Sequence, residues 1–212
     1  MEDARVTRYK TVLGRYLPAE AVEPMFQMLT QDNSVKLHVT RERQSKLGDY
    51  RCPQSGHPYH EISVNGNINP YFFLLVLLHE LAHLNTWKLH GNRVQPHGRE
   101  WQGEYARMLA AYSGLFPIEV RRLIERYVRR LPLERATGRA IEQHLRRYDV
   151  DYVPGEDLTL DDLPLGSMFR LKNGRDIVFR SLEKRRTRYR CVDVATNTPY
   201  LVAGSAPVCV VR

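Results

Sequence analysis

The chain has few cysteines and no long apolar segment. Only three of its 212 residues are cysteine, Cys52, Cys191 and Cys209, and no two of them form a Cys-x-x-Cys pair. This spacing supports neither a disulfide framework nor a zinc knuckle built from thiolates. The one apolar run of note, residues 71–78, is too short to span a bilayer. We therefore expect no membrane segment, and cysteines that pack as small buried hydrophobic residues.

The N-terminus lacks a secretion signal as well. Met-Glu-Asp-Ala has neither the basic start nor the apolar stretch that such a signal needs. Internal repeats and low-complexity tracts are also missing. With 42% hydrophobic residues, the chain is long enough for one substantial core, or for a main domain with a small appendage. We expect a cytoplasmic protein, whose basic character is compatible with association with the nucleoid.

Acidic residues are in the minority. The formal net charge is +8, which favours a polyanionic partner such as nucleic acid without identifying it. Residues 121–147 contain nine arginines against three glutamates, and residues 168–190 contain nine Lys or Arg against Asp176 and Glu183. Amphipathic helices usually turn their charges outward, so we interpret the arginines of residues 121–147 mainly as a solvated face.

The spacing of apolar residues predicts an α+β fold for the first part of the chain. Alternating patterns before residue 66 suit a small antiparallel sheet. A continuous apolar helix pattern follows over residues 71–87, and a further helix is expected over residues 98–112. Pro117 suits the first turn of another helix. Two N-terminal helices and one short helix ending near Tyr148 complete this part.

A change in composition marks a domain boundary near Asp157. Residues 153–164 form an acidic, Pro-containing connector, and alternating strand patterns follow it. Asn173-Gly174 is a strong signal for a two-residue hairpin turn. We therefore predict a main domain over residues 1–152 and a small basic domain resembling a β-barrel over residues 157–212.

One short motif indicates metal chemistry. Residues 79–83 have the sequence His-Glu-Leu-Ala-His inside the helical pattern, so His79 and His83 project from one face, one turn apart, and can share a zinc ion. Glu80 points toward the same edge, where it can act as the general base for a zinc-bound water. Such a string also occurs by chance on surface helices without metal. Here two unliganded histidines in an apolar helix would need other partners, which favours one zinc ion per chain.

The third zinc ligand should come from a neighbouring element. Catalytic zinc usually takes three protein ligands and leaves one position for water. His97, Glu100 and His90 are the candidates. His97 is favoured because it lies between Pro96 and Gly98 at the expected start of the next helix, where its side chain can face back across the loop.

With these residues the chain resembles the SprT-like, or Spartan-type, metalloprotease family. The match rests on residues 79–83, a gap of thirteen residues and then His-Gly-Arg-Glu-Trp over residues 97–101, preceded by residues 45–50 and 62–65. The resemblance implies a compact zincin domain in which helices surround a small three-stranded antiparallel sheet. It also implies that the chain is a zinc metalloendopeptidase that cleaves proteins bound or crosslinked to DNA and is stimulated by DNA. The implied ligands are His79, His83 and His97, and the implied catalytic residue is Glu80.

The C-terminal segment contains a second candidate site. Residues 184–190 combine five Lys or Arg with an aromatic ring at an expected turn between strands. This combination suits phosphate contacts and base stacking on single-stranded nucleic acid. The alternative is a solvated hairpin whose charges keep an edge strand from aggregating. The residues of this candidate site are Lys184, Arg185, Arg186, Arg188, Tyr189 and Arg190.

The residues alone are compatible with three functions. The leading hypothesis is a zinc protease that acts on proteins held on DNA. Its rival is a nucleic-acid-binding protein with a structural zinc site, which a fourth ligand such as Glu100 would favour because structural zinc normally lacks a position for water. A zinc hydrolase of small amides would instead need a deep closed pocket, in place of a groove beside an exposed strand edge.

Overall fold

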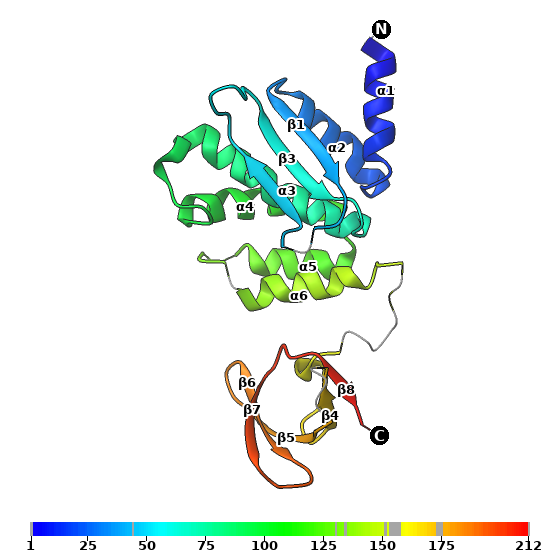
Figure 1. The fold of residues 1–212 in the computed structure, drawn as a ribbon, viewed down its shortest axis with the longest axis vertical. Coiled ribbons are helices and arrows are strands. Elements are labelled where there is room, and N and C mark those ends of the chain that lie inside the picture. The colour runs from blue at the N-terminus through cyan, green and yellow to red at the C-terminus, as the bar shows by residue number, and fades with distance from the viewer. Residues whose placement is uncertain are drawn as a thin grey trace. The chain divides into compact units, whose positions relative to one another are not determined.

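The structure is a computed structural model in which the chain divides into two compact units, Met1–Val150 and Asp151–Arg212. The first unit holds the α-helices and a three-stranded sheet, and the second holds a five-stranded sheet and a short 3-10 helix, η3 (Leu160–Asp162) (Figure 1). The fold is therefore mixed α+β, as the sequence predicts. Asp157, near which the composition changes, and the Asn173-Gly174 turn both lie outside the described residues. The described residues are 2–43, 45–129, 131–133, 135–150, 152, 158–172 and 176–211.

The elements of the first unit follow the predicted order, with helices at the positions that the apolar spacing indicates. Its helices are α1 (Glu2–Leu13), α2 (Ala19–Thr30), α3 (Pro70–His90), α4 (Arg99–Tyr112), α5 (Ile118–Tyr127) and α6 (Arg135–Arg146), and its strands are β1 (Val35–Thr40), β2 (Gly48–Arg51) and β3 (His60–Asn65).

The prediction of an antiparallel sheet is wrong for one strand pair of the first unit. The strand order is β1-β3-β2, and β2 runs antiparallel to β3, whereas β1 runs parallel to it. Alternation of apolar residues identifies strands but contains no information on their direction. The chain reverses twice between β1 and β3, and β3 then enters between its two predecessors, so β1 and β3 point the same way. The strand β2 is consequently an edge strand.

Helix α3 forms the centre of the first hydrophobic core. It begins after Asn69, whose side chain accepts a hydrogen bond from the backbone N–H of Phe72, and it ends at Gly91, where φ is 61°. Its side chains are buried on several faces, and Phe73, Leu74, Leu77 and Leu78 have no exposed surface. Full burial of such a side chain contributes about 1.5–3 kcal/mol, so α3 is a rigid base for the groups that it carries.

The second unit consists of strands that pair antiparallel with their neighbours in the order β7-β6-β5-β4-β8. The sheet curls around its own small core, which includes Leu160, Phe169 and Phe179 (Figure 1). Cys191 is buried in this core as expected, but Cys209 on edge strand β8 is exposed, which corrects the expectation for that residue. The strands are β4 (Met168–Leu171), β5 (Val178–Lys184), β6 (Arg188–Asp193), β7 (Pro199–Ala203) and β8 (Val208–Val210).

None of the helices in the described part of the chain is long and apolar enough to cross a membrane.

Candidate metal centre

Three histidines from two segments meet beside α3. His79 and His83 lie one turn apart on α3, and His97 lies in the loop before α4. His97 has a φ of 58°, a left-handed conformation that histidine adopts more readily than most residues with a side chain. The loop is closed around it, because Gly98 N–H donates to the Gln95 carbonyl at 2.9 Å and the Gln102 side chain donates to the His97 carbonyl at 3.1 Å. The turn thus directs the His97 ring back toward α3.

The three imidazoles converge through their Nε2 atoms. The Nε2 atom of His97 lies 3.0 Å from that of His79 and 3.0 Å from that of His83. Two nitrogens bound to one tetrahedral zinc at about 2.0–2.1 Å would lie roughly 3.3–3.4 Å apart, so the donor set has nearly the required spacing. Within the described residues, neither Glu100 nor His90 belongs to this cluster. Of the three candidates for the third ligand, the structure brings only His97 to the other two histidines.

The histidines are held in the neutral form that binds metals. Burial, together with the nearby His83 and His97, lowers the pKa of His79 to about 3. Burial and His97 lower the pKa of His83 to about 4, and burial lowers the pKa of His97. The ring of Trp101 on α4 packs against all three imidazoles, with centroid distances of 4.6, 5.1 and 4.5 Å to His79, His83 and His97. An apolar wall therefore orients the three rings.

Glu80 lies on the sheet side of α3, beside the first of these histidines. Its side chain is buried, and burial, reinforced by the negative charge of Asp49, raises its pKa to about 7. Arg43 and Lys46 act in the opposite direction. A Cβ atom placed on Gly48 would overlap the Glu80 carboxylate, so the absence of a side chain on β2 makes room for this group. The Glu80 carboxylate and the edge strand β2 therefore lie directly against each other.

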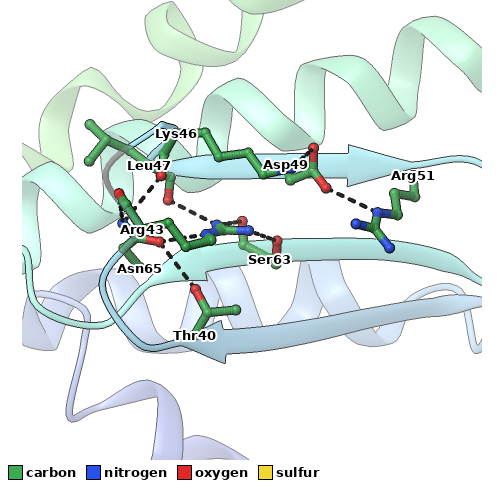
Figure 2. Close-up of polar contacts among 8 residues, drawn as sticks. All are labelled: Thr40, Arg43, Lys46, Leu47, Asp49, Arg51, Ser63 and Asn65. Carbon is green, nitrogen blue, oxygen red and sulfur yellow. Dashed lines mark hydrogen bonds and ion pairs between the residues drawn. The ribbon is translucent and has the colours of Figure 1, made fainter.

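A polar network fixes the loop that leads into β2 (Figure 2). Arg43 Nε donates to Asn65 Oδ1 at 2.8 Å and Arg43 Nη1 donates to Ser63 Oγ at 3.0 Å. Asn65 has no exposed surface, and its Nδ2 donates to the Arg43 carbonyl at 3.1 Å and to the Lys46 carbonyl at 3.2 Å. Sequence reasoning missed Arg43, and it placed Asn65 at the end of a strand without giving its side chain a role. The one local signal of this network was the polar Asn65, followed by Gly66, at the end of an apolar strand.

The histidines and Glu80 open into a cavity of about 490 Å³ beside the edge strand β2. Tyr50 of β2 lines it, and its ring stacks parallel to His83 with 6.2 Å between the centroids. The Tyr50 hydroxyl is engaged with His60 Nδ1 at 2.8 Å. The remaining lining comes from the end of α3, the loop that carries His97, Trp101 of α4 and Cys52. The edge strand β2 and the three histidines thus border the same cavity.

The model of the SprT-like family matches residues 14–122 of the chain. The chain belongs to the SprT-like family. The matched segment contains the first sheet, α3 and α4, and thus every residue of the histidine cluster as well as Glu80. No curated protein and no solved structure matches the chain. Helix α6 and the whole second unit lie outside the segment that is shared with the SprT-like family.

The candidate nucleic-acid site in the second unit needs one correction. Tyr189 is only 3% exposed, and its hydroxyl donates to Asp161 Oδ1 at 3.0 Å, so its ring is not available to stack on a base. The alternation of β6 places this ring on the inner face of the sheet between two outward arginines. Lys184 forms an ion pair of 2.8 Å with the same carboxylate of Asp161. Arg185, Arg186, Arg188 and Arg190 are exposed around the turn between β5 and β6.

Proposed function

We propose that this member of the SprT-like family is a zinc-dependent metalloendopeptidase with a zincin-type centre. His79, His83 and His97 would hold one zinc ion, and Glu80 would act as the general base. The convergence of three neutral imidazoles next to a buried carboxylate, in an open cavity, carries this proposal. A metalloprotease function is also what membership of the SprT-like family suggests.

The donor set fits catalytic zinc better than structural zinc. Catalytic sites have three protein ligands and one open position, whereas structural sites are closed by a fourth protein ligand. Among the described residues, the cluster contains three donors and no fourth. Zinc bound there would polarise the scissile carbonyl and lower the pKa of a water molecule. In the part of the chain that the structure describes, the rival function, a structural zinc site in a binding protein, has no fourth ligand to close the site.

Glu80 is placed to move the proton that hydrolysis releases. It follows the ligand His79 directly in sequence, yet its carboxylate is directed toward Gly48 of β2 and is not part of the histidine cluster. A carboxylate in this position takes a proton from the attacking water and delivers it to the amine that leaves. The close approach of β2 limits the movement of the Glu80 side chain during these transfers.

The edge strand supports a polypeptide substrate over a small amide. Strand β2 pairs with β3 on one side only, and its residues Gly48, Asp49 and Tyr50 line the cavity. An extended substrate can hydrogen-bond along such a free edge, which holds its backbone in one direction across the catalytic groups. For the substrate class we propose proteins bound or crosslinked to DNA, because the chain carries a charge of +8 and exposes a cluster of arginines in its second unit.

The experiment compares the zinc-loaded wild-type protein with Glu80→Gln on a DNA-binding protein substrate, each with and without single-stranded DNA. The amide is nearly isosteric but cannot accept a proton at neutral pH, so we expect equal zinc content and loss of cleavage in the variant. A chelator should stop the wild-type reaction and added zinc should restore it. Equal cleavage by both proteins would exclude Glu80 as the base, and zinc binding without any cleavage would favour the binding-protein alternative.

A further inference from the structure

A second, smaller cavity adjoins the one at the metal centre. Its volume is about 260 Å³, below the roughly 300–1,000 Å³ of sites for drug-sized ligands, and suits a single side chain. His79, Glu80 and Gly48 line this cavity as well as the larger one. A substrate that crosses the histidines would therefore have one side chain at the mouth of the smaller cavity.

The walls of the smaller cavity are largely apolar. Leu75 and Val76 follow Phe72 by three and four positions on the face of α3 that continues to His79, and each of the three is 7–8% exposed. Tyr105 of α4, which is 6% exposed, closes another side. These surfaces would bury the aliphatic part of a substrate side chain.

One acidic residue besides Glu80 lines this cavity, and it comes from α6. Glu142 is solvent-exposed, although burial among neighbouring groups raises its pKa against the lowering effect of Arg146 and Arg139. The cavity thus joins apolar walls to an acidic group, a combination that complements the alkyl stem and charged end of lysine or arginine.

Helix α6 is anchored firmly enough to position Glu142. Its neighbours Ile141 and Leu145 are buried in the first core at 1% and 0% exposure. The side chain of Asn69, which caps α3, donates to the Leu145 carbonyl at 2.8 Å and to Asp149 Oδ1 at 2.6 Å. The same asparagine thus ties the start of α3 to the end of α6, so Glu142 keeps its place relative to the catalytic helix.

We propose that this cavity receives the substrate side chain next to the scissile bond, and that Glu142 makes it selective for lysine or arginine. This inference rests on the proposed peptidase function. It concerns the present chain and not the shared family core, because α6 lies beyond the matched residues 14–122. Proteins that bind DNA are rich in these two residues, so the selectivity would suit the proposed substrates.

The test measures binding of peptide hydroxamates to the zinc-loaded full chain by calorimetry. One pair carries lysine or norleucine directly after the metal-binding group, and a second pair carries them directly before it. Norleucine keeps most of the alkyl stem and lacks the charge. We expect the lysine compound to bind about tenfold more tightly at one of the two positions, a difference of about 1.4 kcal/mol.

The variants assign that preference to one carboxylate. Glu142→Gln should bind both compounds equally, and Glu142→Lys should prefer norleucine. The matched control is Glu125→Gln on α5, because Glu125 pairs with Arg121 and lines neither cavity. It should keep the tenfold preference. Zinc content and circular dichroism verify that each variant is folded and loaded.

Other outcomes overturn the inference in distinguishable ways. Equal binding of lysine and norleucine by the wild-type protein, or a preference that persists in Glu142→Gln, would overturn the subsite alone. Loss of the preference in Glu125→Gln as well would assign it to overall charge and not to the cavity. Failure of every hydroxamate to bind the zinc-loaded protein would overturn both the subsite and the peptidase function.

Discussion

The carboxylate of Glu80 lies against the backbone of Gly48, and a Cβ atom at position 48 would overlap the carboxylate and lie 2.6 Å from Val76 Cγ1. Glycine at this position allows the edge strand β2 to approach α3 closely. Strand β2, which would hold a substrate backbone, and Glu80, which would take the proton of the attacking water, are therefore in direct contact. The position of one depends on the position of the other.

Gly48→Ala should reduce peptide cleavage by about 10- to 100-fold, because the added methyl group must displace either Glu80 or β2 from its place. Zinc content should not change, since the nearest atoms to the added methyl group belong to Glu80 and Val76 and not to the three histidines. Initial cleavage rates at a fixed zinc content measure the effect. Gly103→Ala on α4 is the matched control, because a Cβ there meets no atom within 4 Å. That variant should keep its activity; equal losses in both variants would contradict the steric explanation.

Removal of a histidine from the cluster should remove zinc. His79→Ala or His83→Ala should abolish binding, and His97→Ala should weaken it sharply, because two protein donors do not hold zinc firmly. Elemental analysis and titration against a competing chelator measure this loss. His90→Ala and Glu100→Gln serve as controls, since these residues lie outside the cluster in the structure. If either control loses zinc while His97→Ala retains it, the assignment of the third ligand is wrong.

Asn65→Ala should destabilise the first unit by roughly 2–4 kcal/mol, because it removes a fully buried side chain and leaves the partly buried carbonyls of Arg43 and Lys46 without their donor. The urea midpoint of unfolding measures this change. The matched control is Asn67→Ala, an exposed asparagine two residues along the chain, for which we expect less than about 0.5 kcal/mol. A similar, small effect of both substitutions would show that the network does not stabilise the loop before β2.

The sequence predicted the parts of the site that depend on local geometry. His79 and His83 share a face because of helical periodicity, and a His between Pro and Gly at a helix start indicated the third ligand. Contacts between distant segments left no such periodic signal. Glu142 comes to line a cavity with residues of α3 only because α6 docks on that helix, and the pairing of Arg43 with Asn65 depends on how β3 enters the sheet.

In the second unit, the sequence interpretation was wrong about one side chain of strand β6. The sequence interpretation took the crowding of arginines around Tyr189 as a sign that the ring also faces a ligand. Strand alternation instead turns successive side chains to opposite faces, so an aromatic residue between two exposed arginines belongs to the core. The burial of Tyr189 agrees with this rule. Tyr189→Ala is therefore expected to destabilise the second unit, and not to weaken DNA binding selectively.

Replacement of Arg185, Arg186 and Arg188 by alanine should weaken binding to single-stranded DNA and flatten its salt dependence. These three side chains are exposed around the turn between β5 and β6, and Arg185 has only a long ion pair of 3.9 Å with Glu183, whereas Lys184 pairs with Asp161 at 2.8 Å. Fewer neutralised phosphates release fewer counterions, so the slope of log K against log salt should fall by up to about 2. Fluorescence anisotropy at several salt concentrations measures both quantities.

The control for this experiment is a second triple variant with the same loss of charge, Arg121, Arg122 and Arg126 to alanine on α5. Coulomb attraction between a whole protein and DNA depends on net charge, so both variants should lose some long-range attraction at low salt. Direct phosphate contacts add a steeper salt dependence, and only the variant at the β5–β6 turn should lose that contribution. If the α5 variant flattens the slope and the turn variant does not, the DNA contact lies on the helical arginines, and the turn is an ordinary solvated hairpin.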